Sequence, residues 1–237
     1  MVSDPVELPF IPEYGTEYPY DKNFRVTWFE ANFSQAHYKV HNASRGSNAC
    51  TLIAVLMAAK CNKSKLMVND PGESLNMRLI LLLAESMLEG NKIHDYLKMK
   101  QLIKHINLNV PEAIKYAGPI AKTMVEWKSE IYTDLLSKSL YKNIMENWRV
   151  WRGRLYGYDL YVILVADSRT VVFIIQSKSD TVTLVDSHAH GPDKGAFIAV
   201  AKLRKLKHLC KWYSDVMYTH YHSEPQRYEL SFLFFNK

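Results

Sequence analysis

Cys50 is the residue of this chain best suited to covalent chemistry. A polar loop, Gly46-Ser47-Asn48, precedes it, and an apolar stretch typical of a buried helix runs from Cys50 to Lys60. Ser47 and Asn48 are expected to cap that helix. Free N–H groups and the dipole at a helix N-terminus lower the pKa of a thiol and can hold an oxyanion. We interpret Cys50 as a nucleophile, with a small packing residue as the alternative.

A second group of reactive side chains lies in the segment Val185–Gly191, which reads VDSHAHG. Period-two alternation at the end of a predicted strand places Asp186 and His188 on one face. The carboxylate can then hold the imidazole in the tautomer whose other nitrogen takes the Cys50 proton. The sequence therefore predicts a triad of Cys50, His188 and Asp186. His190 is expected one step further into the loop, facing solvent or substrate.

Two other interpretations of these residues exist. Asp186 and His188 could cap a surface turn, or they could converge with His190 on a metal ion, aided by His220 and His222. The three cysteines have neither metal-site nor disulfide spacing, so Cys61 and Cys210 are interpreted as packing residues. We favour the thiol mechanism and expect no metal and no cofactor.

Helical patterns come first in the chain and strand patterns second, which predicts an α+β architecture. A helical part carrying Cys50 on its central helix is expected to pack against an antiparallel sheet. Gly90-Asn91 is expected to stop a helix. Further helices are expected over 73–88, 92–106, 111–116, 132–148 and 202–214, and strands over 24–29, 160–166, 170–176, 181–186, 196–200 and 228–235.

The proline-rich residues 1–22 are expected to form an extended arm, and residues 23–237 a single catalytic domain. No secretory signal or membrane span is apparent, and with an odd number of cysteines we expect the cytoplasm or nucleus. The net charge is +6, but the basic segment 202–211 alternates with leucines at helical spacing. It is interpreted as a solvated helix face, and nucleic acid is the disfavoured partner.

Taken together, these residues resemble the deubiquitinase domain of herpesvirus large tegument proteins and its non-viral relatives, which are papain-like cysteine proteases. The resemblance rests mainly on VDSHAHGPDKGAF at 185–197 and on the region 46–59, and it extends over residues 33–235. It implies a papain-like fold with Cys50 as nucleophile, His188 as base and Asp186 as orienting carboxylate. Ala189 departs from the family, in which an aromatic residue often follows the catalytic histidine.

The resemblance also implies an oxyanion donor, since the family uses a glutamine about a dozen residues before its cysteine. Gln35 lies 15 residues before Cys50, and His37 lies 13 before it. We assign the donor to Gln35.

The function implied is hydrolysis after the C-terminal glycine of ubiquitin or a ubiquitin-like modifier, with ubiquitin or polyubiquitin chains as partners. The residues alone predict only acyl transfer by a cysteine. The alternatives are a protease or amidase that acts on another peptide, and a catalytically inactive ubiquitin-binding or scaffold protein. A basic nucleic-acid binder is a third, and its affinity would fall steeply with salt.

Overall fold

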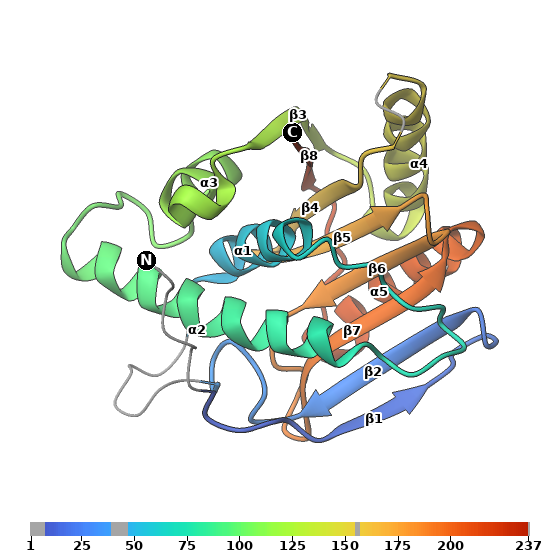
Figure 1. The fold of residues 1–237 in the computed structure, drawn as a ribbon, viewed down its shortest axis with the longest axis horizontal. Coiled ribbons are helices and arrows are strands. Elements are labelled where there is room, and N and C mark those ends of the chain that lie inside the picture. Colours follow the sequence, from blue (N-terminus) through green and yellow to red (C-terminus); the bar gives the residue numbers. More distant parts are fainter. Residues whose placement is uncertain (1–7, 39–46, 155–156, 237) are drawn as a thin grey trace.

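The computed structural model describes residues 8–38, 47–154 and 157–236 (Figure 1). In these residues one eight-stranded antiparallel sheet has the strand order β1-β2-β7-β6-β5-β4-β8-β3. The strands are β1 (Tyr14–Glu17), β2 (Phe24–Glu30), β3 (Met124–Tyr132), β4 (Leu160–Ala166), β5 (Arg169–Gln176), β6 (Thr181–Asp186), β7 (Lys194–Lys202) and β8 (Tyr228–Phe235). The helices are α1 (Cys50–Lys63), α2 (Met77–Met99), α3 (Val110–Ala117), α4 (Leu136–Arg154) and α5 (Leu206–Tyr221), with short 3-10 turns at Gly118–Ala121 and Leu203–Lys205.

Helices cover both faces of the sheet, with α1, α2 and α3 on one side and α4 and α5 on the other (Figure 1). Alternation along β5 shows the division: Val172 and Ile174 belong to the core under α1, whereas Phe173 belongs to the core under α5. Because both faces are buried, the central strands read as almost continuous apolar runs. The three strands predicted over 160–166, 170–176 and 181–186 are confirmed within one residue at each end.

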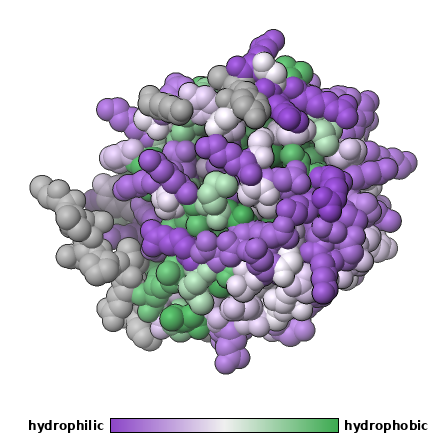
Figure 2. All heavy atoms as spheres, turned by 45° about the vertical axis from the view of Figure 1, so that its right-hand side comes forward, coloured by the Kyte–Doolittle hydropathy of each residue, from purple (hydrophilic) through white to green (hydrophobic). Residues whose placement is uncertain are grey.

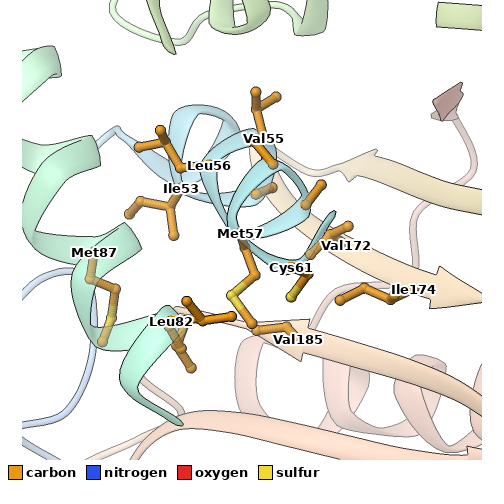
Figure 3. Packing of buried hydrophobic residues seen from close by; sticks show 14 of the residues in the cluster. Ile53, Val55, Leu56, Met57, Cys61, Leu82, Met87, Val172, Ile174 and Val185 are labelled. Atoms are coloured by element: carbon orange, nitrogen blue, oxygen red, sulfur yellow. The ribbon is translucent and has the colours of Figure 1, made fainter. Parts of the chain in front are cut away.

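Helix α1 is the central helix, and every residue from Cys50 to Ala59 is buried. Figure 3 shows Met57 and Cys61 of α1 beside Val172, Ile174 and Val185 of the sheet. The predicted α+β architecture, with the cysteine on a central helix packed against an antiparallel sheet, is confirmed.

The predicted helix stop at Gly90-Asn91 is wrong, because α2 continues through both residues to Met99. A Cβ atom at Gly90 would lie 2.6 Å from Cγ1 of Ile53, so the glycine lets α2 approach α1 closely. Asn91 is buried and binds the loop before α1. The separate helix predicted over 92–106 is therefore wrong: residues 92–99 belong to α2, and residues 100–106 are not helical.

Two strands were not predicted, and both lie at sheet edges. β3 pairs with β8, but its half-exposed sequence MVEWKSEIY lacks a clean apolar alternation. α4 consequently begins four residues later than predicted, at Leu136. β1 lies inside residues 1–22, for which an extended arm is predicted, and it pairs with β2. Residues 1–7 of that arm lie outside the described residues.

The basic segment 202–211 includes the end of β7, the 3-10 turn and the start of α5, so the helix predicted from residue 202 begins at Leu206. The apolar side of α5 packs on the sheet. Two of the basic side chains of the segment form ion pairs: Lys202 with Asp70, and Lys205 with Asp21 at 2.6 Å. The face in Figure 2 is covered largely by hydrophilic side chains, with smaller apolar areas between them. None of the helices in the described parts of the chain is long and apolar enough to cross a lipid bilayer.

Candidate active site

Cys50 is the first residue of α1, and its thiol is buried. The predicted cap by Ser47 and Asn48 is wrong in detail. Ala49 occupies the N-cap position without a side-chain acceptor, the Ser47 hydroxyl accepts from the Ala49 N–H at 3.1 Å, and Asn48 binds Asn107. The first turn of α1 therefore has no capping side chain that would compete with an anion. Gly46 lies outside the described residues.

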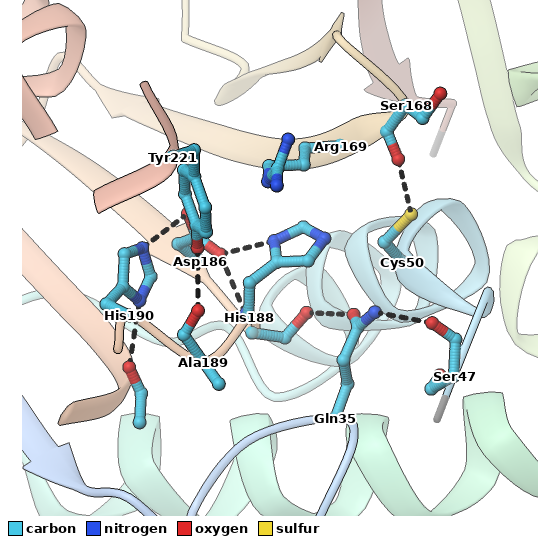
Figure 4. Close-up of polar contacts among 12 residues, drawn as sticks. Gln35, Ser47, Cys50, Ser168, Arg169, Asp186, His188, Ala189, His190 and Tyr221 are labelled. Atoms are coloured by element: carbon cyan, nitrogen blue, oxygen red, sulfur yellow. Dashed lines mark hydrogen bonds and ion pairs between the residues drawn. The ribbon is translucent and has the colours of Figure 1, made fainter. Parts of the chain in front are cut away.

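Asp186 ends β6, is fully buried, and holds His188 by two hydrogen bonds to the same oxygen. Oδ1 accepts from the backbone N–H of His188 at 2.8 Å and lies 2.6 Å from its ring Nδ1. Figure 4 shows the ring between Asp186 and Cys50, with its other nitrogen facing the thiol. The structure thus brings the three residues of the predicted triad together from α1, the end of β6 and the loop that follows β6.

Electrostatics in this group favour a charged pair. Burial opposes ionisation of the Cys50 thiol, yet a hydrogen bond with His188, the charge of His188 and hydrogen bonds with Thr170 lower its pKa below the ordinary value. Burial also opposes the charged form of His188, but the Asp186 carboxylate and Cys50 raise the pKa of His188 well above its usual range. The thiolate and the imidazolium are therefore the stable partners.

The other two cysteines differ sharply from Cys50. Burial and the charge of Asp159 raise the pKa of Cys61 to about 12, and burial raises the pKa of Cys210 further. Both thiols are buried in helices and remain protonated at neutral pH.

The lowered pKa of Cys50 predicts an unusual pH profile for alkylation. Iodoacetamide attacks the thiolate, so wild-type Cys50 should react at lower pH than an ordinary thiol does. His188→Ala removes the hydrogen bond and the charge that lower this pKa while leaving burial, so the reaction should move to higher pH. The check is the rate of Cys50 alkylation against pH, followed by peptide mass spectrometry. Superimposable profiles for the two proteins would contradict the ion pair.

Gln35 joins the two backbone segments that carry Cys50 and His188. Its side-chain oxygen accepts from the Ser187 hydroxyl at 2.8 Å, and its Nε2 donates to the Ser47 carbonyl at 3.2 Å (Figure 4). Its backbone N–H also donates to the Ser187 carbonyl at 2.7 Å. An amide Nε2 has two hydrogens. One of them is used by Ser47, which leaves the other for a ligand.

Asn91 supports this bridge from α2. Its side chain donates to the backbone carbonyl of Gln35 at 2.9 Å and accepts from the Ser47 hydroxyl at 2.6 Å. His37, the residue closer to the family spacing, instead has its Nδ1 3.0 Å from the Ser34 hydroxyl.

The expectation that His190 faces solvent or substrate is wrong. Its side chain is fully buried, with Nε2 3.3 Å from Oδ2 of Asp186 and Nδ1 2.9 Å from the carbonyl oxygen of Gly195. The chain turns back after His190, whose backbone N–H donates to the Lys194 carbonyl at 2.7 Å. In the described residues no three His, Cys, Asp or Glu side chains are grouped as metal ligands.

The turn between β4 and β5 is a part of the site that sequence reasoning missed. Cys50 Sγ lies 4.0 Å from the carbonyl oxygen of Ser168, and the guanidinium of Arg169 lies 3.7 Å from the centre of the Tyr221 ring. The Tyr221 hydroxyl donates to the carbonyl of Ala189 at 2.9 Å. The predicted strands 160–166 and 170–176 leave residues 167–169 between them, but only the tertiary structure places these residues beside Cys50.

No protein-family model matches this chain, and no curated protein matches it by sequence. Among solved structures it is similar to the ubiquitin-specific protease encoded by a murine cytomegalovirus tegument protein, crystallised with a ubiquitin-based suicide substrate. The TM-score is 0.50 at 13% identity, over 88% of this chain and 85% of that one. The Pseudomonas avirulence protein AvrPphB gives a TM-score of 0.47 at 8% identity, over 81% of this chain and 96% of that one. The likeness to the viral protease shows the fold: this chain has the papain-like cysteine protease fold predicted from its sequence.

Proposed function

We propose that this chain is a cysteine protease that removes ubiquitin or a ubiquitin-like modifier from conjugates. The observation that carries the proposal is the alignment of Cys50, His188 and Asp186: a thiol at a helix N-terminus, a ring facing it, and a buried carboxylate bound to the far side of that ring. This arrangement is the one that acyl transfer by a cysteine requires.

The first half of the reaction forms a thioester. The Cys50 thiolate attacks the carbonyl carbon of the modifier's terminal glycine, and the carbonyl becomes a tetrahedral oxyanion. As the intermediate collapses, the bond from carbon to the lysine nitrogen breaks, and the His188 imidazolium gives its proton to the departing amine. His188 is then neutral, and the modifier is bound to Cys50.

The second half restores the enzyme. Neutral His188 takes a proton from water, the resulting hydroxide attacks the thioester carbon, and the bond to sulfur breaks to give a carboxylic acid and the Cys50 thiolate. Asp186 keeps the ring oriented and stabilises its cationic form through both halves. The oxyanion is held by the backbone N–H groups at the start of α1 and by the unused Nε2 hydrogen of Gln35.

The choice of ubiquitin rests on two supports. The segment 185–197 resembles the viral tegument deubiquitinases, and the structure with a similar fold is that of a ubiquitin-specific protease with a ubiquitin-based substrate. The same triad would equally serve a protease or amidase that acts on another peptide, which is the second candidate function.

A panel of activity probes tests the proposal. Ubiquitin and several ubiquitin-like proteins, each with a thiol-reactive group in place of the C-terminal carboxylate, are incubated with the wild-type chain. We expect covalent labelling by ubiquitin or by one related modifier, and cleavage of the matching isopeptide-linked conjugate. Reaction with short peptide probes alone would favour the second candidate. Binding of ubiquitin without labelling by any probe would favour an inactive ubiquitin-binding protein.

A further inference from the structure

Two imidazoles of the loop after β6 lie on opposite oxygens of one buried carboxylate. His188 Nδ1 is 2.6 Å from Oδ1 of Asp186, and His190 Nε2 is 3.3 Å from Oδ2 (Figure 4). We propose that His190 is a positioning residue that holds Asp186 in place from the side away from Cys50. The inference rests on the proposed cysteine-protease reaction, in which Asp186 orients His188.

The two nitrogens of the His190 ring contact two different elements of the site. Nδ1 lies 2.9 Å from the carbonyl oxygen of Gly195, which can only accept, so Nδ1 donates to it. Nε2 lies 3.3 Å from Oδ2 of Asp186, the carboxylate oxygen that His188 does not use. The ring therefore bridges the Asp186 carboxylate and the backbone at Gly195.

The other charged and titratable groups near His190 do not replace it. Arg169 is stacked on Tyr221, and the Lys194 ammonium lies 4.4 Å from the centre of the Trp28 ring. Burial and the charges of His190 and Lys194 lower the pKa of His220, which is therefore neutral, and Asp193 is exposed. In the described residues, His190 is thus the side chain in direct contact with Oδ2 of Asp186.

The surroundings of the ring fix its position. Its centre lies 5.1 Å from those of the Trp28 and Phe197 rings, 5.3 Å from Tyr221 and 5.5 Å from His220. These neighbours come from β2, β7 and α5, so three elements enclose the ring. A Cβ atom at Gly195 would overlap backbone carbonyl oxygens of Glu30 and Phe33. A glycine is therefore needed at position 195 for the backbone to come close enough that its carbonyl accepts from Nδ1–H of His190.

The test measures the alkylation rate of Cys50 by iodoacetamide at neutral pH, a reaction that needs no modifier. His190→Phe keeps a ring among the aromatic neighbours and removes both ring nitrogens, and we expect the rate to fall on the order of ten- to a hundredfold, as when a group behind a functional residue is lost. His190→Gln keeps one donor and should retain more of the rate than His190→Phe. A wild-type rate in His190→Phe would overturn the proposal, and so would equal losses in both variants.

A double-mutant cycle with Asp186→Asn separates positioning from packing. If His190 acts through Asp186, the double variant should be alkylated less than about threefold more slowly than Asp186→Asn alone. Fully additive losses would show a merely structural role and overturn the proposal.

His94→Phe is the matched control, since His94 is a buried histidine whose ring contacts the Ile106 carbonyl. Cys50 in this variant should react at the wild-type rate. An unreactive wild-type Cys50 would overturn both the proposed function and the role of His190, whereas a reactive wild type that is insensitive to His190 would overturn only the latter.

Discussion

Replacing His188 with alanine is expected to lower the hydrolysis rate of a ubiquitin C-terminal amide by about three orders of magnitude or more, the loss typical when a catalytic base is removed from a triad. Two effects combine in this loss. The leaving amine has no proton donor, and the Cys50 thiol loses the hydrogen bond and charge that lower its pKa. Steady-state cleavage, with folding checked by circular dichroism, measures the effect.

Asp186→Asn should lower the hydrolysis rate less than His188→Ala does. Asparagine can still accept a hydrogen bond from the ring, but it stabilises the imidazolium poorly. His37→Ala serves as the matched histidine control and should keep the wild-type rate, because the polar contact of its ring is with Ser34. If His188→Ala were active and His190→Ala inactive, the triad would have to be redrawn around His190.

Replacing Gln35 with alanine is expected to lower kcat by about a hundred- to a thousandfold with little change in KM, as found when one oxyanion donor is removed. The reason is that the unused hydrogen of Nε2 meets the oxyanion only after attack has begun. Single-turnover formation of the thioester is the most direct measurement, because it isolates the step in which the oxyanion develops.

Gln35→Glu and Ser187→Ala distinguish this role from packing. Glutamate keeps the shape of the side chain but places negative charge beside the oxyanion, so it should be at least as damaging as alanine. Ser187→Ala removes the hydroxyl that binds the Gln35 side-chain oxygen but leaves the Nε2 donor, and it should lower kcat by less than about tenfold. An active Gln35→Glu variant would contradict the assignment.

The parts of the site that sequence reasoning could reach are those set by local patterns. Cys50 follows a polar loop and opens an apolar helix, and Asp186 and His188 are two apart at a strand end. Both patterns fix geometry over a few residues. The strands with continuous apolar runs were predicted for the same reason, whereas the edge strands β1 and β3 carry no such pattern.

The parts that sequence reasoning missed depend on contacts between distant segments. His190 is buried because β2, β7 and α5 meet around it, and nothing in the loop sequence indicates that meeting. Gly90 and Asn91 resemble a helix stop in sequence. In the structure Gly90 allows α2 to approach α1, and Asn91 binds Ser47 in the loop before Cys50. At Gly90 and Asn91 the tertiary contacts override the local preference of these residue types for helix ends.

The central claim is that Cys50 is the nucleophile, and mapping the cysteine labelled by a thiol-reactive ubiquitin probe tests it most directly. Cys50 alone combines a helix N-terminus with a facing histidine, whereas burial raises the pKa of Cys61 and Cys210. Peptide mass spectrometry should place the adduct on Cys50, with labelling lost in Cys50→Ala and unchanged in Cys61→Ala and Cys210→Ala. An adduct on Cys61 or Cys210, or undiminished labelling of Cys50→Ala, would contradict the account.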